Sequence, residues 1–145
     1  MAKFSHAEDI RASVGAVWSI LTNASSWSQW LPGVEAVSGV SDVVQGATFQ
    51  WESGGHTGNG SFTKVEPQQL LRIFLQLGNQ KADHTFQLST HGGLLGVGGK
   101  GSHLVYTLEY HATGGVLGEF VAGGNPVDMI KVKRTVEAVK EIAER

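Results

Sequence analysis

Residues 10–34 constrain the fold of this chain more than any other stretch. Ser13 can cap a helix there, because its hydroxyl can accept a hydrogen bond from a first-turn amide. Apolar residues then recur at helical spacing, at Val14, Val17, Trp18 and Leu21. A second apolar cluster follows after residues 23–26, at Trp27, Trp30 and Leu31. Pro32 ends that cluster, so the segment predicts two small helices directly after an edge strand.

Most of the remaining chain alternates between apolar and polar residues with a period of two, and glycine-rich turns separate the alternating runs. The strand candidates are Phe4–Arg11, Val34–Val40, Thr48–Ser53, Gly58–Val65, Leu70–Leu77, His84–Thr90 and His103–Ala112. No connection between successive strands is long enough for the helical crossover that parallel pairing requires. The sequence therefore predicts an antiparallel meander.

The chain ends on a predicted helix from Pro126 to Arg145. Asn125 can cap this helix, Pro126 suits its first position, and Asp128 lies near the positive end of its dipole. Its apolar stripe is Met129, Val132, Val136, Val139 and Ala143. At the standard rise the helix is about 30 Å long, and its single apolar face needs a sheet to cover it.

Length and composition exclude several classes of protein. A chain of 145 residues is one domain by the usual prior, and its formal net charge of −2 gives no basic excess for nucleic acid. The cationic cluster of Lys131, Lys133 and Arg134 is interpreted as a solvated helix face. The chain has no cysteine, so it has no disulfide and no thiol nucleophile. Without a membrane-length apolar run or a signal-peptide core, we expect a cytoplasmic protein with no integral membrane segment.

One further pattern extends over almost the whole chain. It consists of Ile10, Ala12, Val17, Trp18, Leu21, the run Trp30–Val34, the turn Val65–Pro67, the strand Leu70–Leu77 and the closing run Val136–Ile142. This pattern resembles the SRPBCC superfamily of START-like or helix-grip proteins, and above all its polyketide cyclase/dehydrase and lipid-transport family. The superfamily also includes Hsp90-activator homologues.

The resemblance implies a single START-like domain over residues 1–145 with an α+β helix-grip fold. In that fold a curved antiparallel sheet of six or seven strands wraps a long C-terminal helix, and two small helices follow the first strand. The resemblance also implies a ligand cavity between the sheet and that helix. It says much less about function, because the matching positions are mostly packing positions.

Strand alternation predicts which side chains face such a cavity. The inward candidates are His6, Glu8, Trp51, His84, Phe86, Leu104, Tyr106, Leu108 and Tyr110, and the helix adds Met129. Apolar walls with a few polar groups are typical of small-molecule sites. The polar members also have structural interpretations: a hydrogen-bonded or solvated pair for His6 and Glu8, a rim position for His84, and core packing for the tyrosines.

No familiar catalytic or metal-binding motif is present. The run Gly96–Gly101 resembles a phosphate loop only weakly, because Lys100 is not followed by Ser or Thr. The six histidines never fall at the i, i+4 spacing of a helical metal site. We therefore expect no metal and no cofactor, although a cluster drawn from three strands stays open.

Three functions compete. The first is binding or carrying a hydrophobic small molecule such as a lipid, isoprenoid or polyketide, by a monomer or homodimer. The second is an aromatic cyclase or dehydratase, which needs an acid/base pair such as His6 with Glu8 or Tyr106 with His84. The third is an interaction module like the Hsp90-activator homologues. We rank them in this order and leave catalytic residues unassigned.

Two glycine-rich loops are candidate lids for the cavity. Gly92–Gly101 and Gly114–Gly124 carry isolated apolar residues in otherwise flexible backbone. The hypothesis is that both loops flank the mouth of the cavity and order when ligand enters. The alternative is that residues 116–121 form an extra turn before the last helix.

Overall fold

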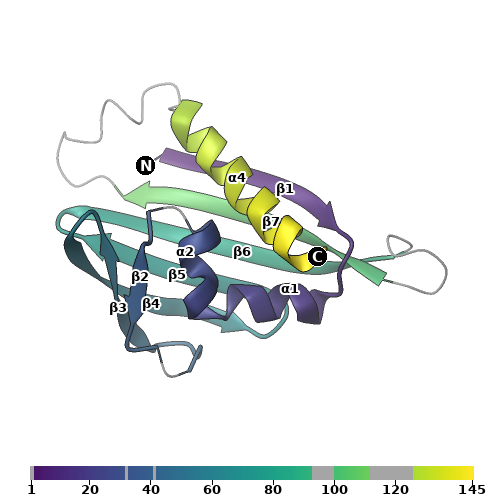
Figure 1. Ribbon diagram of the computed structural model, residues 1–145, viewed down its shortest axis with the longest axis horizontal. Coiled ribbons are helices and arrows are strands. Elements are labelled where there is room, and N and C mark those ends of the chain that lie inside the picture. The colour runs from purple at the N-terminus through teal and green to yellow at the C-terminus, as the bar shows by residue number, and fades with distance from the viewer. Residues whose placement is uncertain (1, 32, 41, 93–99, 112–125) are drawn as a thin grey trace.

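The structure is a computed structural model that describes the chain except residues 1, 32, 41, 93–99 and 112–125. Its elements in chain order are β1 (Ala2–Ile10), α1 (Val14–Leu21), the 3-10 helix η1 (Ala24–Ser26), α2 (Trp27–Trp30), β2 (Ala36–Ser38), β3 (Thr48–Ser53), β4 (His56–Glu66), β5 (Leu70–Leu77), β6 (Gln80–Gly92), β7 (Lys100–His111) and α4 (Pro126–Ala143) (Figure 1).

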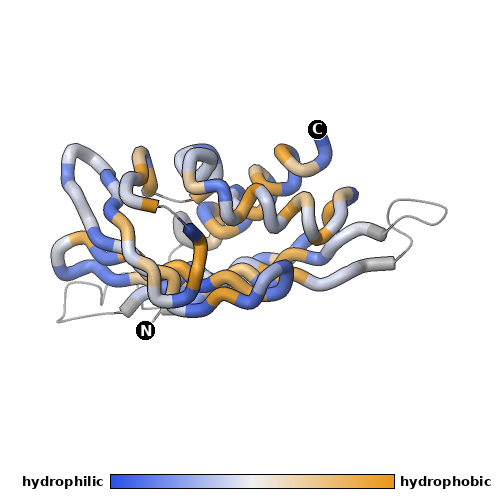
Figure 2. The backbone as a smooth tube through the Cα atoms, turned by 90° about the horizontal axis from the view of Figure 1, so that it is seen from below, coloured by the Kyte–Doolittle hydropathy of each residue, from blue (hydrophilic) through white to orange (hydrophobic). Residues whose placement is uncertain are grey.

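The seven strands form one antiparallel sheet in the order β1-β7-β6-β5-β4-β3-β2. Strands β2 to β7 are a meander, and β1 joins the far edge by pairing with β7. The helices all lie on one face of the sheet, as Figure 2 shows. The predicted α+β helix-grip fold is confirmed, with two small helices after the first strand and a long helix at the end.

The core lies between the sheet and the helix layer. Burial confirms the predicted inward faces of the strands: Phe4 and Ile10 on β1 are at most 5% exposed, and Tyr106 on β7 is fully buried. Helix α4 packs against β1 and β7 and also contacts α1 and α2. It contributes its buried stripe of Val132, Val136 and Val139. The alternation of period two therefore gave the correct phase on every strand for which it was predicted.

Two glycines on β4 make room for the aromatic residues of β3. A Cβ on Gly58 would lie 2.7 Å from Nε1 of Trp51, and a Cβ on Gly60 would overlap the ring of Phe49. Each aromatic side chain therefore lies across the backbone of its cross-strand partner, since Gly58 pairs with Trp51 and Gly60 with Phe49. A Cβ on Gly58 would also overlap the backbone carbonyl of Gln76 on β5. Glycine is required at both positions because a side chain there would displace an aromatic ring or, at Gly58, the neighbouring strand.

The β4–β5 turn has an unusual backbone. Its four residues are 66–69, and the amide of Gln69 donates to the carbonyl of Glu66 at 2.9 Å. Pro67 occupies the second position, and Gln68 at the third position has a φ of 63°. A positive φ at the third position of a turn that has proline at its second position is the signature of type II. Glycine is the usual residue at that third position. Gln68 occupies that conformation at a cost of about 1–2 kcal/mol.

Several expectations about element ends, and one about a helix residue, are corrected. Strand β2 is only Ala36–Ser38 and not Val34–Val40. Strands β1, β4 and β7 begin at Ala2, His56 and Lys100, two or three residues before the predicted starts. Strand β6 begins at Gln80 rather than His84, since residues 80–83 continue the ladder with β5 beyond the turn. Helix α4 ends at Ala143 rather than Arg145. Met129, expected on the buried stripe, is 46% exposed. Figure 1 shows the reason, since the first turn of α4 extends beyond the edge strand β1. Asn125 and most of both candidate lids lie outside the described residues.

Candidate functional site

A pocket of about 180 Å³ opens where the β5–β6 hairpin meets the start of α4. We call it the end pocket. Its apolar and backbone lining comes from the sheet and the residues after α2: Gly33, Trp51, Leu75, Leu77 and Ala82. Its polar lining is Ser53, Gln80, Lys81, His84, Tyr110 and Lys131. Apolar walls with a few polar groups fit an organic ligand, but the volume lies below the roughly 300 Å³ of a small drug site.

Other hollows of the described surface are larger and shallower. One of about 560 Å³ lies over the outer side of β3 and β4, and one of about 790 Å³ lies beside the β4–β5 turn. Their linings include outward-facing polar residues such as Gln50, Asn59 and Ser89. The end pocket differs because inward-facing residues of the sheet form its wall, and we take it as the candidate site.

Trp51 forms one wall of the end pocket in a fixed orientation. Its indole N–H donates to the carbonyl of Asn59 at 3.0 Å, and its ring lies against Gly58. The side chain is only 8% exposed. Because a hydrogen bond and a close backbone contact both hold the ring, the pocket wall is preformed.

His84 and Tyr106 form a hydrogen-bonded pair at the inner wall of the pocket. Nδ1 of His84 and the hydroxyl of Tyr106 lie 2.6 Å apart, and the two rings are stacked within 8° of parallel. Tyr106 also stacks on Phe86, with ring centroids 4.6 Å apart. His84 was predicted to face the cavity, and its alternative interpretation as a rim residue is wrong, because the residue is 4% exposed. The error follows from the strand boundary, since β6 starts at Gln80.

Burial shifts the pKa values of His84 and Tyr106 away from neutral pH, in opposite directions. Desolvation lowers the pKa of His84 from 6.5 to about 3, so its imidazole is neutral. Desolvation and the nearby Tyr110 raise the pKa of Tyr106 well above its usual value, so its hydroxyl keeps its proton. General acid and base catalysts work best with a pKa near the operating pH. Both groups are therefore suited to hydrogen bonding more than to acid or base catalysis.

The structure divides the predicted site residues into groups. Trp51, His84 and Tyr110 line the end pocket. Phe86, Leu104, Tyr106 and Leu108 are at most 1% exposed and fill the space above the middle of the sheet. Met129 lies on the exposed side of α4. The described part of the expected cavity is thus largely packed, and the end pocket lies at its end.

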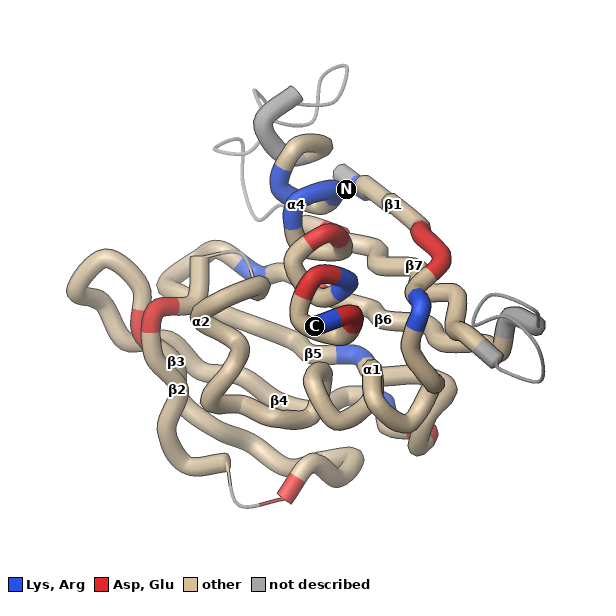
Figure 3. The backbone as a smooth tube through the Cα atoms, turned by 45° about the vertical axis from the view of Figure 1, so that its right-hand side comes forward, with Lys and Arg blue, Asp and Glu red and all other residues tan. Residues whose placement is uncertain are grey.

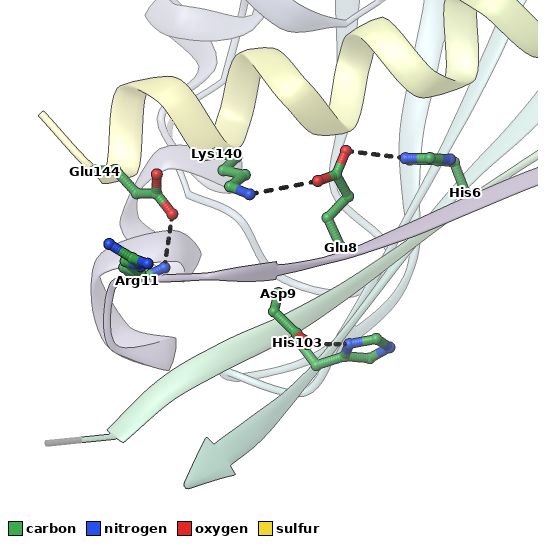
Figure 4. A network of polar contacts seen from close by, with 7 residues as sticks. All are labelled: His6, Glu8, Asp9, Arg11, His103, Lys140 and Glu144. Carbon is green, nitrogen blue, oxygen red and sulfur yellow. Dashed lines mark hydrogen bonds and ion pairs between the residues drawn. The ribbon is translucent and has the colours of Figure 1, made fainter. Parts of the chain in front are cut away.

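His6 and Glu8 form a separate network at the edge strand (Figure 4). Nε2 of His6 lies 3.0 Å from Oε2 of Glu8, and Nζ of Lys140 on α4 lies 3.4 Å from Oε1 of the same carboxylate. The hydrogen bond from His6, with a smaller contribution from Lys140, holds the pKa of Glu8 below its usual value. About one helical turn after Lys140, the carboxylate of Glu144 accepts a hydrogen bond from the backbone N–H of Arg11 at 2.8 Å. This network docks α4 on β1 and lines no part of the end pocket.

Charge is unevenly distributed along α4. Figure 3 shows Lys and Arg on its earlier described turns, and both Glu and basic residues on its later ones. Among the residues that the structure describes, no group of three or more His, Asp or Glu could hold a metal ion. Within the same residues, no helix has both the length and the apolar character needed to cross a membrane.

Several lining residues were not predicted from the sequence. Leu75 lies on the inward face of β5 and could have been found from the alternation of Leu70–Leu77. Ala82 lies on the inward face of β6 but in a part of that strand that was not predicted. Lys131 was assigned to a solvated helix face, and no periodicity indicates that the pocket opens beside it.

The chain matches known proteins in family and in fold. Residues 1–144 match the family "Polyketide cyclase / dehydrase and lipid transport". The fold is similar to that of the Aha1 dimer from Colwellia psychrerythraea, at 17% identity and a TM-score of 0.67, over 99% of this chain and 97% of that one.

Two more solved structures share the fold. The protein CV1439 from Chromobacterium violaceum is 13% identical with a TM-score of 0.71, over 100% of this chain and 99% of that one. A truncated norcoclaurine synthase from Thalictrum flavum is 14% identical with a TM-score of 0.65, over 97% and 91% of the two chains. No curated protein matches. Identities this low show the fold alone, whereas the family match extends over nearly every residue. The chain therefore belongs to the polyketide cyclase / dehydrase and lipid transport family of helix-grip proteins.

Proposed function

We propose that this protein binds a hydrophobic small molecule, such as a lipid, isoprenoid or polyketide-like compound, and that the end pocket receives it. The observation that carries the proposal is the preformed wall of Trp51, Leu75 and Leu77 beside a few polar groups. Membership of a family named for cyclases, dehydrases and lipid transport supports it. Because the pocket is small, it would hold a small ligand or one end of a longer one.

Binding without chemistry is favoured over a cyclase reaction. The His84–Tyr106 pair has the right contact for acid/base work, with 2.6 Å between Nδ1 and the hydroxyl. Its pKa values oppose that role, because His84 is a weak base at a pKa of about 3 and Tyr106 a weak acid. The His6–Glu8 pair does not line the end pocket. A carrier needs neither pair to move a proton.

Mass spectrometry of an organic extract of the native-purified protein tests the proposal. We expect a retained hydrophobic compound, and we expect Ala82→Phe to lose it because the new ring fills the pocket. Ala7→Phe is the matched control, since Ala7 is exposed on the outer side of β1 and lines none of the described pockets. An extract that is empty, or a compound that stays bound to Ala82→Phe, would contradict the proposal.

The change Tyr110→Phe separates a carrier from an enzyme at the pocket wall. For a carrier, loss of this hydroxyl should change ligand affinity by about 0.5–1.5 kcal/mol, the net value of a neutral hydrogen bond. For a cyclase, it should leave affinity unchanged and reduce turnover by roughly 10²–10⁴. Calorimetry and product analysis with the extracted compound measure the two effects, and Tyr106→Phe extends the comparison to the buried hydroxyl.

The oligomeric state is part of the same proposal. The Colwellia structure with this fold is a dimer, which keeps a homodimer open beside a monomer. Sedimentation equilibrium with and without the extracted compound distinguishes the two states.

A further inference from the structure

We propose that the end pocket receives a small apolar molecule with a neutral carbonyl group, and that the Nε2–H of His84 donates a hydrogen bond to the carbonyl oxygen. Tyr106 is then a positioning residue, because its hydroxyl decides which ring nitrogen of His84 carries the proton. This inference rests on the proposed function and narrows it to one chemical class of ligand.

One ring nitrogen of His84 is left over at the pocket wall. The residue lines the end pocket and is only 4% exposed, and its Nδ1 is bonded to the hydroxyl of Tyr106. Within the described part of the chain, Oγ of Ser102 is the one side-chain polar atom that is both fully enclosed and without a partner. Nε2 of His84 is therefore not enclosed. Buried polar groups are ordinarily hydrogen-bonded, so an open nitrogen in a pocket wall suits a ligand atom.

The hydroxyl of Tyr106 determines the tautomer of His84. With a pKa of about 3, the imidazole is neutral at pH 7 and has one N–H and one lone pair. A proton on Nδ1 would be donated to the oxygen of Tyr106, and the hydroxyl proton of this fully buried residue would lack an acceptor among the described residues. A buried donor without an acceptor is destabilising. The hydroxyl therefore donates to Nδ1, and the ring proton of His84 lies on Nε2.

A neutral donor in an apolar wall favours a neutral acceptor. The neighbouring lining includes Trp51, Leu75 and Ala82. A carboxylate at this buried wall would lose its hydration for a single neutral hydrogen bond, whereas a carbonyl oxygen is much less costly to desolvate. A hydroxyl would accept too, but it adds a donor of its own. Since the pocket holds about 180 Å³, the body of the ligand is expected to be one ring or a short chain.

The first test measures the tautomer in the wild-type protein. Long-range ¹H–¹⁵N correlation spectra distinguish protonated from unprotonated ring nitrogens, and through-bond correlations to its own backbone assign the ring of His84. We expect the proton on Nε2. In Tyr106→Phe the preference for Nε2–H should weaken, because the donor to Nδ1 is removed. A proton found on Nδ1 in the wild type would overturn the proposal.

The second test uses a matched pair of probes. Acetophenone and α-methylstyrene have nearly the same shape, because a C=CH₂ group replaces the carbonyl, and only acetophenone accepts a hydrogen bond. The indole N–H of Trp51 reports binding in ¹H–¹⁵N NMR titrations, because it is hydrogen-bonded in the pocket wall. Acetophenone should also shift the Nε2 signal of His84 more than α-methylstyrene does. Benzoate, which is anionic at neutral pH, should bind more weakly than acetophenone.

Two histidine variants locate the effect. His84→Phe keeps an aromatic ring and removes the donor, so it should weaken acetophenone about three- to tenfold relative to α-methylstyrene. His103→Phe is the matched control, because His103 is accessible to solvent and does not line the end pocket. It should leave both affinities unchanged. Circular dichroism verifies that both variants keep the fold.

The outcomes separate this inference from the proposed function. Equal weakening of both probes in His84→Phe, or tighter binding of benzoate than of acetophenone, overturns the preference for a neutral carbonyl and leaves apolar binding intact. If neither acetophenone nor α-methylstyrene shifts the Trp51 signal, the inference is also overturned. The extract of the native protein then shows independently whether the pocket binds a hydrophobic molecule at all.

Discussion

The buried His84 should make the protein sensitive to mild acid. Its imidazole is neutral in the folded state, because burial lowers its pKa from 6.5 to about 3. In the unfolded chain the same group takes up a proton as the pH falls through about 6.5. The unfolded state therefore binds more protons than the folded state between these two values. Stability falls as the pH falls across that window, and it is restored above pH 6.5.

The magnitude follows from the two pKa values. One proton bound only by the unfolded state costs about 1.4 kcal/mol per pH unit once the pH is below 6.5. Between pH 7.5 and pH 5 the loss from His84 amounts to about 2 kcal/mol. Glu8 contributes mainly at lower pH, since its folded pKa is lowered from 4.5 and its stabilisation is lost only as that carboxylate is protonated. Within the window from pH 7.5 to pH 5, Glu8 therefore adds little to the change expected from His84.

Urea unfolding at pH 7.5 and pH 5 measures the effect. We expect the free energy of unfolding of the wild type to fall by about 2 kcal/mol more than that of His84→Gln. The glutamine cannot titrate and keeps an amide near Tyr106. The exposed His103, which bonds to Asp9 at 2.8 Å, provides the control variant His103→Gln, which retains His84 and should retain the fall. Equal losses in the wild type and His84→Gln would refute the reasoning.

Three substitutions test the packing and the backbone. Trp30→Ala should lower the free energy of unfolding by about 3–5 kcal/mol, because the 4% exposed indole packs edge-on against Phe86. An unchanged midpoint in chemical denaturation would contradict this. Gly58→Ala should lower the free energy of unfolding by about 1–3 kcal/mol and shift the Trp51 indole signal in NMR, since the new methyl meets both that ring and the backbone carbonyl of Gln76, and an unshifted signal would exclude the contact with the ring. Gln68→Gly should stabilise the protein by up to about 1 kcal/mol, because glycine removes the strain of a positive φ. A loss of stability would indicate that the contacts of the Gln68 side chain outweigh that strain.

The fold could be predicted largely because its signals are local. Alternation fixes the face of a strand once one buried residue is known, and Ile10 supplied that reference for β1. The last helix was found from its stripe of Val132, Val136 and Val139. The same periodicity misplaced Met129, because helical spacing says which face a residue shares and not where the covering sheet ends.

The site was harder to predict because a pocket is the space that packing leaves. The inward face of β7 was assigned correctly, yet Tyr106 and its neighbours fill the space that was expected to be a cavity. Lys131 and Leu77 meet at the end pocket from elements that are far apart in sequence, and no spacing reports such a meeting. The cytoplasmic location and the single-domain boundaries stay predictions from the sequence.

The strand order also bears on how copies of this chain could associate. Among the described strands, the sheet ends on β1 and β2, and an exposed sheet edge is a template for pairing with another strand. Strand β2 has only three residues, which is too short to recruit a partner firmly. Strand β1 is longer, but it carries the charged residues Lys3, Glu8 and Asp9, and charges on an edge strand discourage such pairing. Joining two sheets edge to edge is thus disfavoured on both sides, and a homodimer of this protein would be expected to use a surface other than the sheet edges.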